Sequence, residues 1–139
     1  QKISTLQEFL EIPASYIAVM AYLARGKDDQ VMKIRSALSK KLDRPVTFGW
    51  GPRFLHSTGQ IHKGGQPNGC FIQITTDIEL DLPIPNEEFT FADLLVAQAL
   101  GDAAALSERN LPLIRIHLKS TETGITDLLK EFKRLLITP

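Results

Sequence analysis

The chain alternates between short apolar runs and longer stretches in which apolar residues recur every three or four positions. The short runs are rich in β-branched and aromatic residues, which is typical of buried strands. The run at 16–23 is apolar on all sides and fits a strand buried on both faces. A helix is the alternative there, since Tyr16, Met20 and Leu23 share one helical face. Further strands are predicted at 46–49, 70–75 and 113–118.

Helices are predicted between these runs. A short one at 5–12 ends at Pro13, because proline cannot continue a helix. A second begins at Asp28 or Asp29, either of which could cap it, and stops at Pro45. Its apolar side repeats at helical spacing. The residues of that side are Val31, Ile34, Leu38 and Leu42.

Two more helices are predicted in the second half of the chain. Thr90 and Asp93 have the spacing of a capping box. We expect that helix to break near Gly101 and Asp102 to cap a second helical turn that reaches Ser107. The last helix has a continuous apolar stripe with charges on its other face. The stripe consists of Ile125, Leu128, Leu129, Phe132, Leu135 and Leu136.

The order of these elements predicts an α/β fold with three layers, α/β/α, around a mainly parallel sheet. Most strands are followed by helices, and the strands have the composition of strands covered on both sides. In such sheets, ligands bind beyond the carboxyl ends of the strands. That edge is therefore where we expect a site.

Length, charge and cysteine content limit the classes of function that fit this sequence. A length of 139 residues fits a single domain, 1–139. The 16 basic residues balance 16 acidic ones, so the net charge gives no reason to expect binding to nucleic acid or to an anionic membrane. The single cysteine, Cys70, cannot form an intramolecular disulfide and starts a buried strand, so we expect it to serve packing. With no membrane span or signal peptide in the pattern, we expect a soluble cytoplasmic protein. Because Gln1 is not a start methionine, we expect a processed chain or a fragment.

The connection at 49–69 carries the candidate chemistry. It holds six glycines and two prolines, and no Asp or Glu occurs anywhere from 45 to 76. A locally positive loop rich in hydroxyls and backbone N–H groups is typical of a site for a small anion such as phosphate. The candidate residues are Arg53, His56, Ser57, Thr58, Gln60, His62 and Lys63.

Plainer interpretations stay open for the same residues. Arg53 and Lys63 could be solvated loop charges, and His56 and His62 could be hydrogen-bonded structural histidines. The two histidines lack Cys or carboxylate companions, so no metal site is predicted. Ser57 and Thr58 could cap a short helix starting near Thr58. Outside the loop, His117 lies in a strand pattern, and we expect a structural role for it.

The stretch 51–65, GPRFLHSTGQIHKGG, resembles the C-terminal signature of the glucose-6-phosphate isomerase part of bifunctional transaldolase/glucose-6-phosphate isomerases. The runs 16–23, 70–75 and 97–102, together with Phe91, fit the same pattern. The resemblance implies a sugar-isomerase domain of flavodoxin-like type. It implies reversible isomerisation of glucose 6-phosphate and fructose 6-phosphate by ring opening and enediol proton transfer, without metal or organic cofactor.

The resemblance also implies roles for individual residues. Ordinary isomerases carry a glutamine, a glutamate four residues on, and a lysine three further. Aligning that lysine with Lys63 places His56 at the glutamine position and Gln60 at the glutamate position. Lys63 would stabilise charge on the ring oxygen or O1, whereas Gln60 cannot act as a carboxylate. Arg53, Ser57, Thr58 and His62 are the implied substrate contacts.

The family's enediol base and most of its phosphate site lie on earlier sequence, and a histidine comes from another subunit. The resemblance therefore implies the C-terminal portion of a larger enzyme, inactive alone, with an isomerase domain and possibly a transaldolase domain before it. It implies a homo-oligomer, a phosphosugar substrate, and no nucleic-acid or membrane partner. A non-catalytic phosphosugar-binding module and a structural docking domain are the alternatives.

Overall fold

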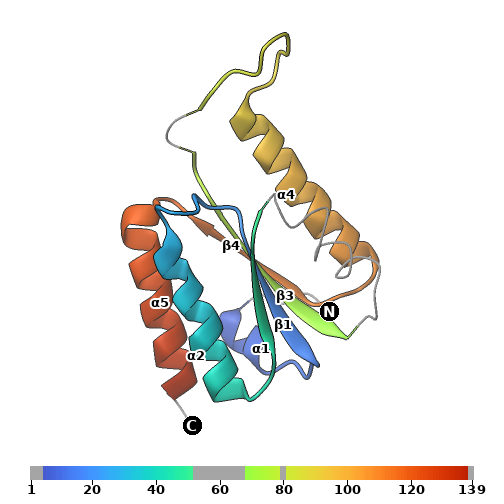
Figure 1. The fold of residues 1–139 in the computed structure, drawn as a ribbon. Helices are drawn as coiled ribbons and strands as arrows, with labels where there is room; N and C mark the ends of the chain where they lie inside the picture. The colour runs from blue at the N-terminus through green and yellow to red at the C-terminus, as the bar shows by residue number, and fades with distance from the viewer. Residues whose placement is uncertain (1–4, 52–67, 79–80, 138–139) are drawn as a thin grey trace.

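The computed structural model describes residues 5–51, 68–78 and 81–137. Its centre is a sheet of four parallel strands in the order β2-β1-β3-β4 (Figure 1). This confirms the predicted α/β class. The strands are β1 (Tyr16–Ala21), β2 (Val46–Trp50), β3 (Gly69–Thr76) and β4 (Leu113–Leu118).

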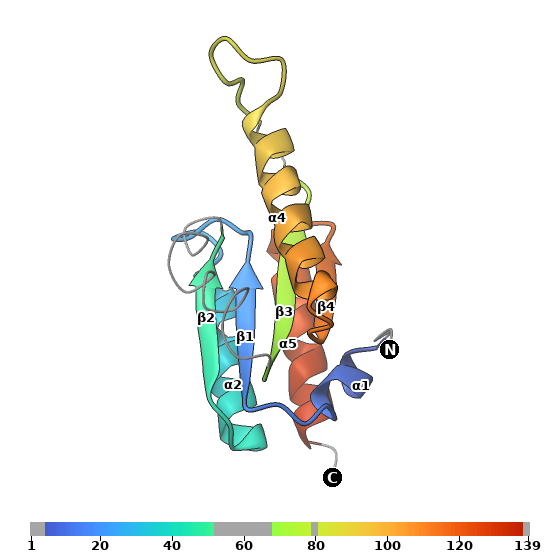
Figure 2. The same ribbon diagram turned by 90° about the vertical axis from the view of Figure 1, so that its right-hand side faces the viewer.

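Helices cover both faces of the sheet and make the three layers. The helices are α1 (Leu6–Leu10), α2 (Lys33–Leu42), α4 (Phe91–Glu108) and α5 (Thr121–Ile137), with a 3₁₀ turn η1 (Asp29–Met32) before α2. Among the described elements, α1, α2 and α5 contribute to one core and α4 to the other (Figures 1 and 2). This division decides where a site can form.

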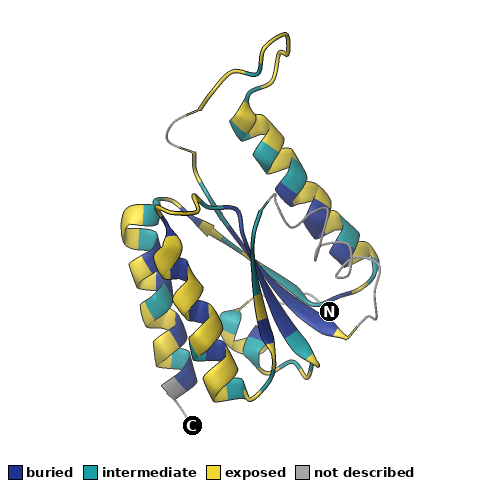
Figure 3. Ribbon diagram, viewed as in Figure 1, coloured by how far each residue is buried: buried dark blue, intermediate teal, exposed yellow. Residues whose placement is uncertain are grey.

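The central strands are buried on both faces, as their composition predicts. Residues 17–21 of β1 and 69–74 of β3 are all buried (Figure 3). On the side of α2 and α5, Phe9, Ile34 and Phe132 pack with the inward residues of β1 and β3. On the side of α4, Ala99 and Leu106 pack with Met20 and Phe71.

Two local predictions are wrong in detail. Helix α4 runs without a break through Gly101, because glycine lowers helix stability by only about 1 kcal/mol and tertiary contacts outweigh that cost. Asp102 caps no second turn but faces the sheet. In the turn before η1, Asp28 makes no side-chain cap, and its carboxylate accepts a hydrogen bond from the backbone N–H of Ala24 at 2.8 Å. Asp29 similarly accepts from the N–H of Gly26 at 2.6 Å.

Two further local predictions are confirmed. Thr90 and Asp93 form a reciprocal capping box at the start of α4, with both side chains accepting hydrogen bonds from backbone N–H groups. The stripe of α5 lies against α2, where Phe132 is 1% exposed. Among the described residues, no helix is both long enough and apolar enough to cross a bilayer.

Candidate functional site

A cleft opens at the carboxyl ends of the strands, between the sheet and α4. In the sheet, β2 lies on one side of β1, and β3 and β4 lie on its other side. The strand order therefore reverses between β1 and β3. Parallel α/β sheets bind ligands in the crevice at such a point. The cleft has a volume of about 330 Å³, within the range of small-molecule sites. Its walls include Tyr22, Lys27, Gly51, Thr75, Thr76, Asp77, Val96 and Thr121.

Gly51, directly after β2, lies against the ring of Tyr22 at this cleft. A Cβ placed on Gly51 would come within 2.7 Å of the Tyr22 ring, closer than carbon atoms approach without displacement. The ring has little room to move, because Tyr22 is 9% exposed. The close approach therefore requires glycine at position 51.

The hydroxyl of Tyr22 donates a hydrogen bond of 2.7 Å to the Asp102 carboxylate, in a buried setting. Burial, together with this hydrogen bond and the neighbouring negative charge, raises the pKa of Tyr22 well above its usual value. Asp102 is 4% exposed and stands in α4. The bond therefore joins α4 to Tyr22, the residue that follows β1 and lines the cleft.

A second buried contact holds α4 on the sheet. The Gln73 amide of β3 donates to the Ala99 carbonyl at 2.8 Å, and its oxygen accepts from Nε of Arg115 at 2.7 Å. Gln73 is fully buried. Because both its nitrogen and its oxygen are hydrogen-bonded, the buried amide fixes the position of α4 on the sheet without the free-energy cost of an unpaired polar group. Sequence reasoning missed Gln73, although a lone amide within an apolar strand was visible.

Three side chains form a hydrogen-bonded row beside the cleft. The imidazole of His117 lies 2.8 Å from the Thr75 hydroxyl through Nδ1 and 2.8 Å from the Asp77 carboxylate through Nε2. A neutral imidazole with its proton on Nε2 donates to Asp77 and accepts from Thr75. Thr75 and Asp77 both line the cleft. His117 thus links the Thr75 hydroxyl to the Asp77 carboxylate, and both of its ring nitrogens are engaged in hydrogen bonds.

His117 lies in β4, as the strand pattern predicts, and the structural role expected for it stays a prediction. The side chains of His117 and Asp77 are 53% and 69% exposed, so neither fills the core. An exposed pair of this kind contributes little to stability. Thr75 and His117 are direct register partners across β3 and β4, a neighbourhood that the sequence alone does not reveal.

Cys70, by contrast, behaves as expected. It lies fully buried at the amino end of β3, and burial raises the pKa of its thiol to about 11. A thiol with such a pKa is protonated at neutral pH and is a poor nucleophile. Its predicted role in packing is confirmed.

The residues predicted from the connection lie outside the described residues. They are Arg53, His56, Ser57, Thr58, Gln60, His62 and Lys63. Gly51, the first residue of the stretch that carries the family resemblance, is described and lines the cleft. Within the described ranges, no three Cys, His, Asp or Glu side chains gather as a metal site would require.

Neither a family model nor a curated protein sequence matches this chain. Among solved structures, it is similar to the crystal structure of a hypothetical protein from the bacterium Thermus thermophilus. The TM-score is 0.73 at 16% identity, and the match covers 94% of this chain but 35% of that one. The likeness supports the fold, and the chain spans about a third of the length of that protein.

Proposed function

We propose that this chain is the C-terminal portion of a glucose-6-phosphate isomerase and forms one wall of its sugar-phosphate site. One observation carries the proposal. Gly51 opens the stretch that resembles the family signature, and the same residue lines the cleft at the point where the strand order reverses between β1 and β3. The stretch is thus attached to the edge at which parallel α/β sheets bind small ligands.

The reaction needs groups that move protons on the sugar oxygens, together with a base for the carbon-bound proton. In this proposal the Lys63 ammonium stabilises charge on the ring oxygen or O1, with His56 and Gln60 beside it. On the described side of the cleft, the Thr75 hydroxyl and the Asp77 carboxylate offer hydrogen bonds to the sugar, and His117 links the two. The carboxylate base belongs to earlier sequence of the larger enzyme.

Phosphate binding is assigned to cations and hydroxyls of the same connection. Arg53, Ser57, Thr58 and His62 are the proposed contacts, since guanidinium, imidazole and hydroxyl groups all donate to phosphate oxygens. The proposed enzyme is a cytoplasmic homo-oligomer that uses neither metal nor organic cofactor. An isomerase domain precedes this chain within it, and in the bifunctional form a transaldolase domain precedes that one.

The test is Lys63→Ala in the full-length enzyme, assayed for conversion of fructose 6-phosphate to glucose 6-phosphate. We expect turnover to fall by about 10²–10⁴-fold, the usual contribution of a positioned proton-transfer or charge-stabilising group. Lys119→Ala is the matched control, because that exposed lysine follows β4 and lies outside the cleft lining. Near-normal turnover of the Lys63 variant would remove that residue from the mechanism.

A full-length protein with no isomerase activity would contradict the proposal itself. In that case, NMR titration of this chain with fructose 6-phosphate would separate the two alternatives. Shifts confined to residues of the cleft would support a non-catalytic phosphosugar-binding module. Absence of binding would favour a structural docking domain.

A further inference from the structure

The loop 81–90 and the first half of α4, residues 91–100, form an arm that projects beyond the carboxyl edge of the sheet (Figures 1 and 2). The contacts of α4 with the sheet come from its middle and second half, where Ala99, Ala103 and Leu106 are buried. Large apolar side chains of the arm are exposed instead. They are Leu82 (57%), Phe89 (44%), Phe91 (46%), Leu94 (36%), Val96 (53%) and Leu100 (48%).

Local hydrogen bonds hold the arm in one conformation. The Asp81 carboxylate accepts from the backbone N–H groups of Leu82 and Ala92, at 2.8 and 2.9 Å. The N–H of Phe91 donates to the Leu82 carbonyl at 2.9 Å, and Pro83 and Thr90 form a bridge. An apolar surface that is ordered before binding loses little conformational entropy when a partner covers it.

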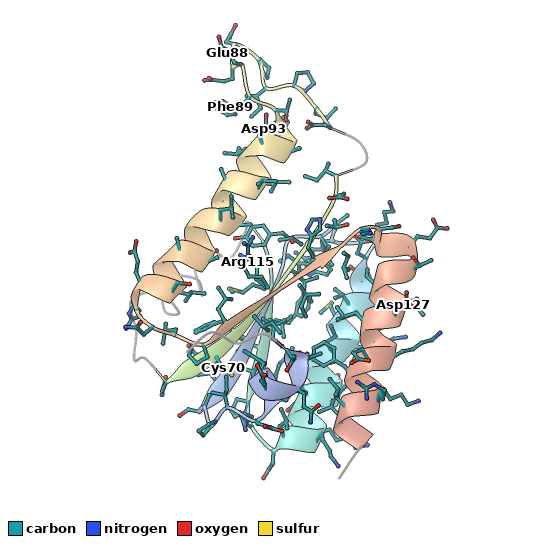
Figure 4. The ribbon with its side chains drawn as sticks, turned by 180° about the vertical axis from the view of Figure 1, so that it is seen from behind. Cys70, Glu88, Phe89, Asp93, Arg115 and Asp127 are labelled. Atoms are coloured by element: carbon teal, nitrogen blue, oxygen red, sulfur yellow. The ribbon has the colours of Figure 1, made fainter. Side chains whose placement is uncertain are left out.

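The arm is acidic as well as apolar. From residue 64 to residue 108 the sequence has eight Asp and Glu residues and no Lys or Arg. We call residues 81–94 the tip of the arm. Four of these acids belong to it: Asp81, Glu87, Glu88 and Asp93. Figure 4 shows Glu88, Phe89 and Asp93 together at the end of the arm. The tip therefore fits a surface that is apolar in the middle and basic at its rim.

Such a surface exists on the same chain, between α2 and α5. A groove of about 610 Å³ has an apolar floor formed by the half-buried Ala37 and Leu129, above the buried Phe132. Lysines surround that floor: Lys33, Lys40, Lys41 and Lys133. The groove lies on the opposite side of the sheet from α4 (Figure 1), so the arm of the same molecule cannot reach it.

We propose that the acidic, apolar tip of the arm docks into the lysine-rimmed groove of a second copy of this chain. Four acids at the tip meet four lysines at the rim, while Phe89, Phe91 and Leu94 cover the apolar floor. The alternative of two arms paired with each other would bring acidic tips and acidic helix faces together, which is repulsive. The contact joins two different surfaces, so it builds a ring or a chain of copies. It does not depend on the isomerase proposal.

Sedimentation velocity of the full chain tests this contact, at protein concentrations from about 10 µM to 1 mM in low salt. We expect self-association that weakens at least about tenfold in 1 M NaCl, where the screening length is about 3 Å. Two variants with reversed charge are compared, Glu87→Lys/Glu88→Lys at the tip and Lys40→Glu/Lys41→Glu at the rim. Each variant alone should associate at least about tenfold more weakly, because like charges then meet.

Mixing the two variants is the decisive measurement. The reversed tip of one then meets the reversed rim of the other, and the normal tip meets the normal rim, so association should return. Recovery also shows that both variants fold. A monomeric parent chain at every concentration would overturn the proposal. So would a rim variant that associates as the parent does, which would indicate pairing of arms, or a mixture that stays monomeric.

Discussion

The two faces of the sheet are built differently. On the face of α1, α2 and α5, large side chains such as Phe9, Ile34 and Phe132 are completely or almost completely buried. On the face of α4, the buried helix residues are mostly small, and polar groups take part in the packing through Gln73 and Asp102. The first face supplies most of the apolar burial, whereas the second positions a cleft and leaves an apolar arm exposed.

The difference explains where function can reside. An apolar layer of interlocking side chains tolerates little change, and it offers no polar group to a ligand. A layer fixed by a few directed hydrogen bonds leaves room for a crevice at the strand ends. The proposed site uses α4, the helix that is half covered, whereas the proposed contact joins the arm of one copy to the outer surface of α2 and α5 on a second copy.

The largest expected effect is on the apolar face. Phe132→Ala should lower the free energy of unfolding by about 3–5 kcal/mol, because it opens a cavity among fully packed side chains. Leu100→Ala in α4 is the matched control and should change stability by less than about 0.5 kcal/mol, since Leu100 is half exposed. Urea unfolding of both variants measures the contrast. Equal effects would contradict the division of the core.

The second largest effect on stability is expected at the cleft, beside Tyr22. Gly51→Ala should destabilise the protein by about 1–3 kcal/mol, because the added methyl group meets the confined ring of Tyr22. Gly101→Ala is the control, with no atom within 4 Å of the added carbon and a helical environment. That substitution should instead stabilise by about 0.5–1 kcal/mol. Opposite shifts in thermal midpoint are expected, and an unchanged or raised midpoint for Gly51→Ala would argue against the close approach.

The third effect concerns the bond that holds α4 on the sheet. Tyr22→Phe removes the donor to Asp102 and leaves a buried carboxylate oxygen without that partner, at a cost of about 1–3 kcal/mol. Asp102→Asn keeps an acceptor at the same place and should cost less. Hydrogen exchange should rise along α4 more than along α5 in the Phe variant. A uniform rise would show that the bond does not hold α4 specifically.

The smallest expected effect is on the free energy of unfolding at alkaline pH. Because the pKa of Tyr22 is raised in the folded protein, its contribution to stability is complete below the unfolded value of about 10 and is lost as the pH rises above it. The free energy of unfolding should therefore fall more steeply above pH 10 in the parent chain than in Tyr22→Phe. Denaturant titrations at pH 9, 10 and 11 test this. Parallel curves would contradict the raised pKa.

Local patterns predicted the strands and helices because their causes are local. The apolar composition of 16–23 and the spacing of Thr90 and Asp93 each act within a few residues, and both features appear in the structure. The predicted break at Gly101 was wrong for the opposite reason. Asp102 has its partner 80 residues away on Tyr22, and no local rule reveals a contact of that kind.

The candidate site was less accessible to sequence reasoning than the fold. His117 has the pattern of a structural strand residue until β3 is known to lie beside β4, which brings Thr75 and Asp77 next to it. The cleft itself follows from strand order, a property of the whole chain. The predicted residues of the connection between β2 and β3 stay predictions, since they lie outside the described residues.

The position of Cys70 makes the molecule a convenient reporter of its own opening. It is the only cysteine of the chain, and it is fully buried in β3, a strand hydrogen-bonded to neighbours on both sides. Cys70 lies at the amino end of β3 and packs in the core on the side of α1, α2 and α5. A thiol reagent can reach it only when that end of the strand or that core opens, so the rate of labelling measures this opening with no introduced probe. Fraying of α4 or of the arm should leave this rate unchanged.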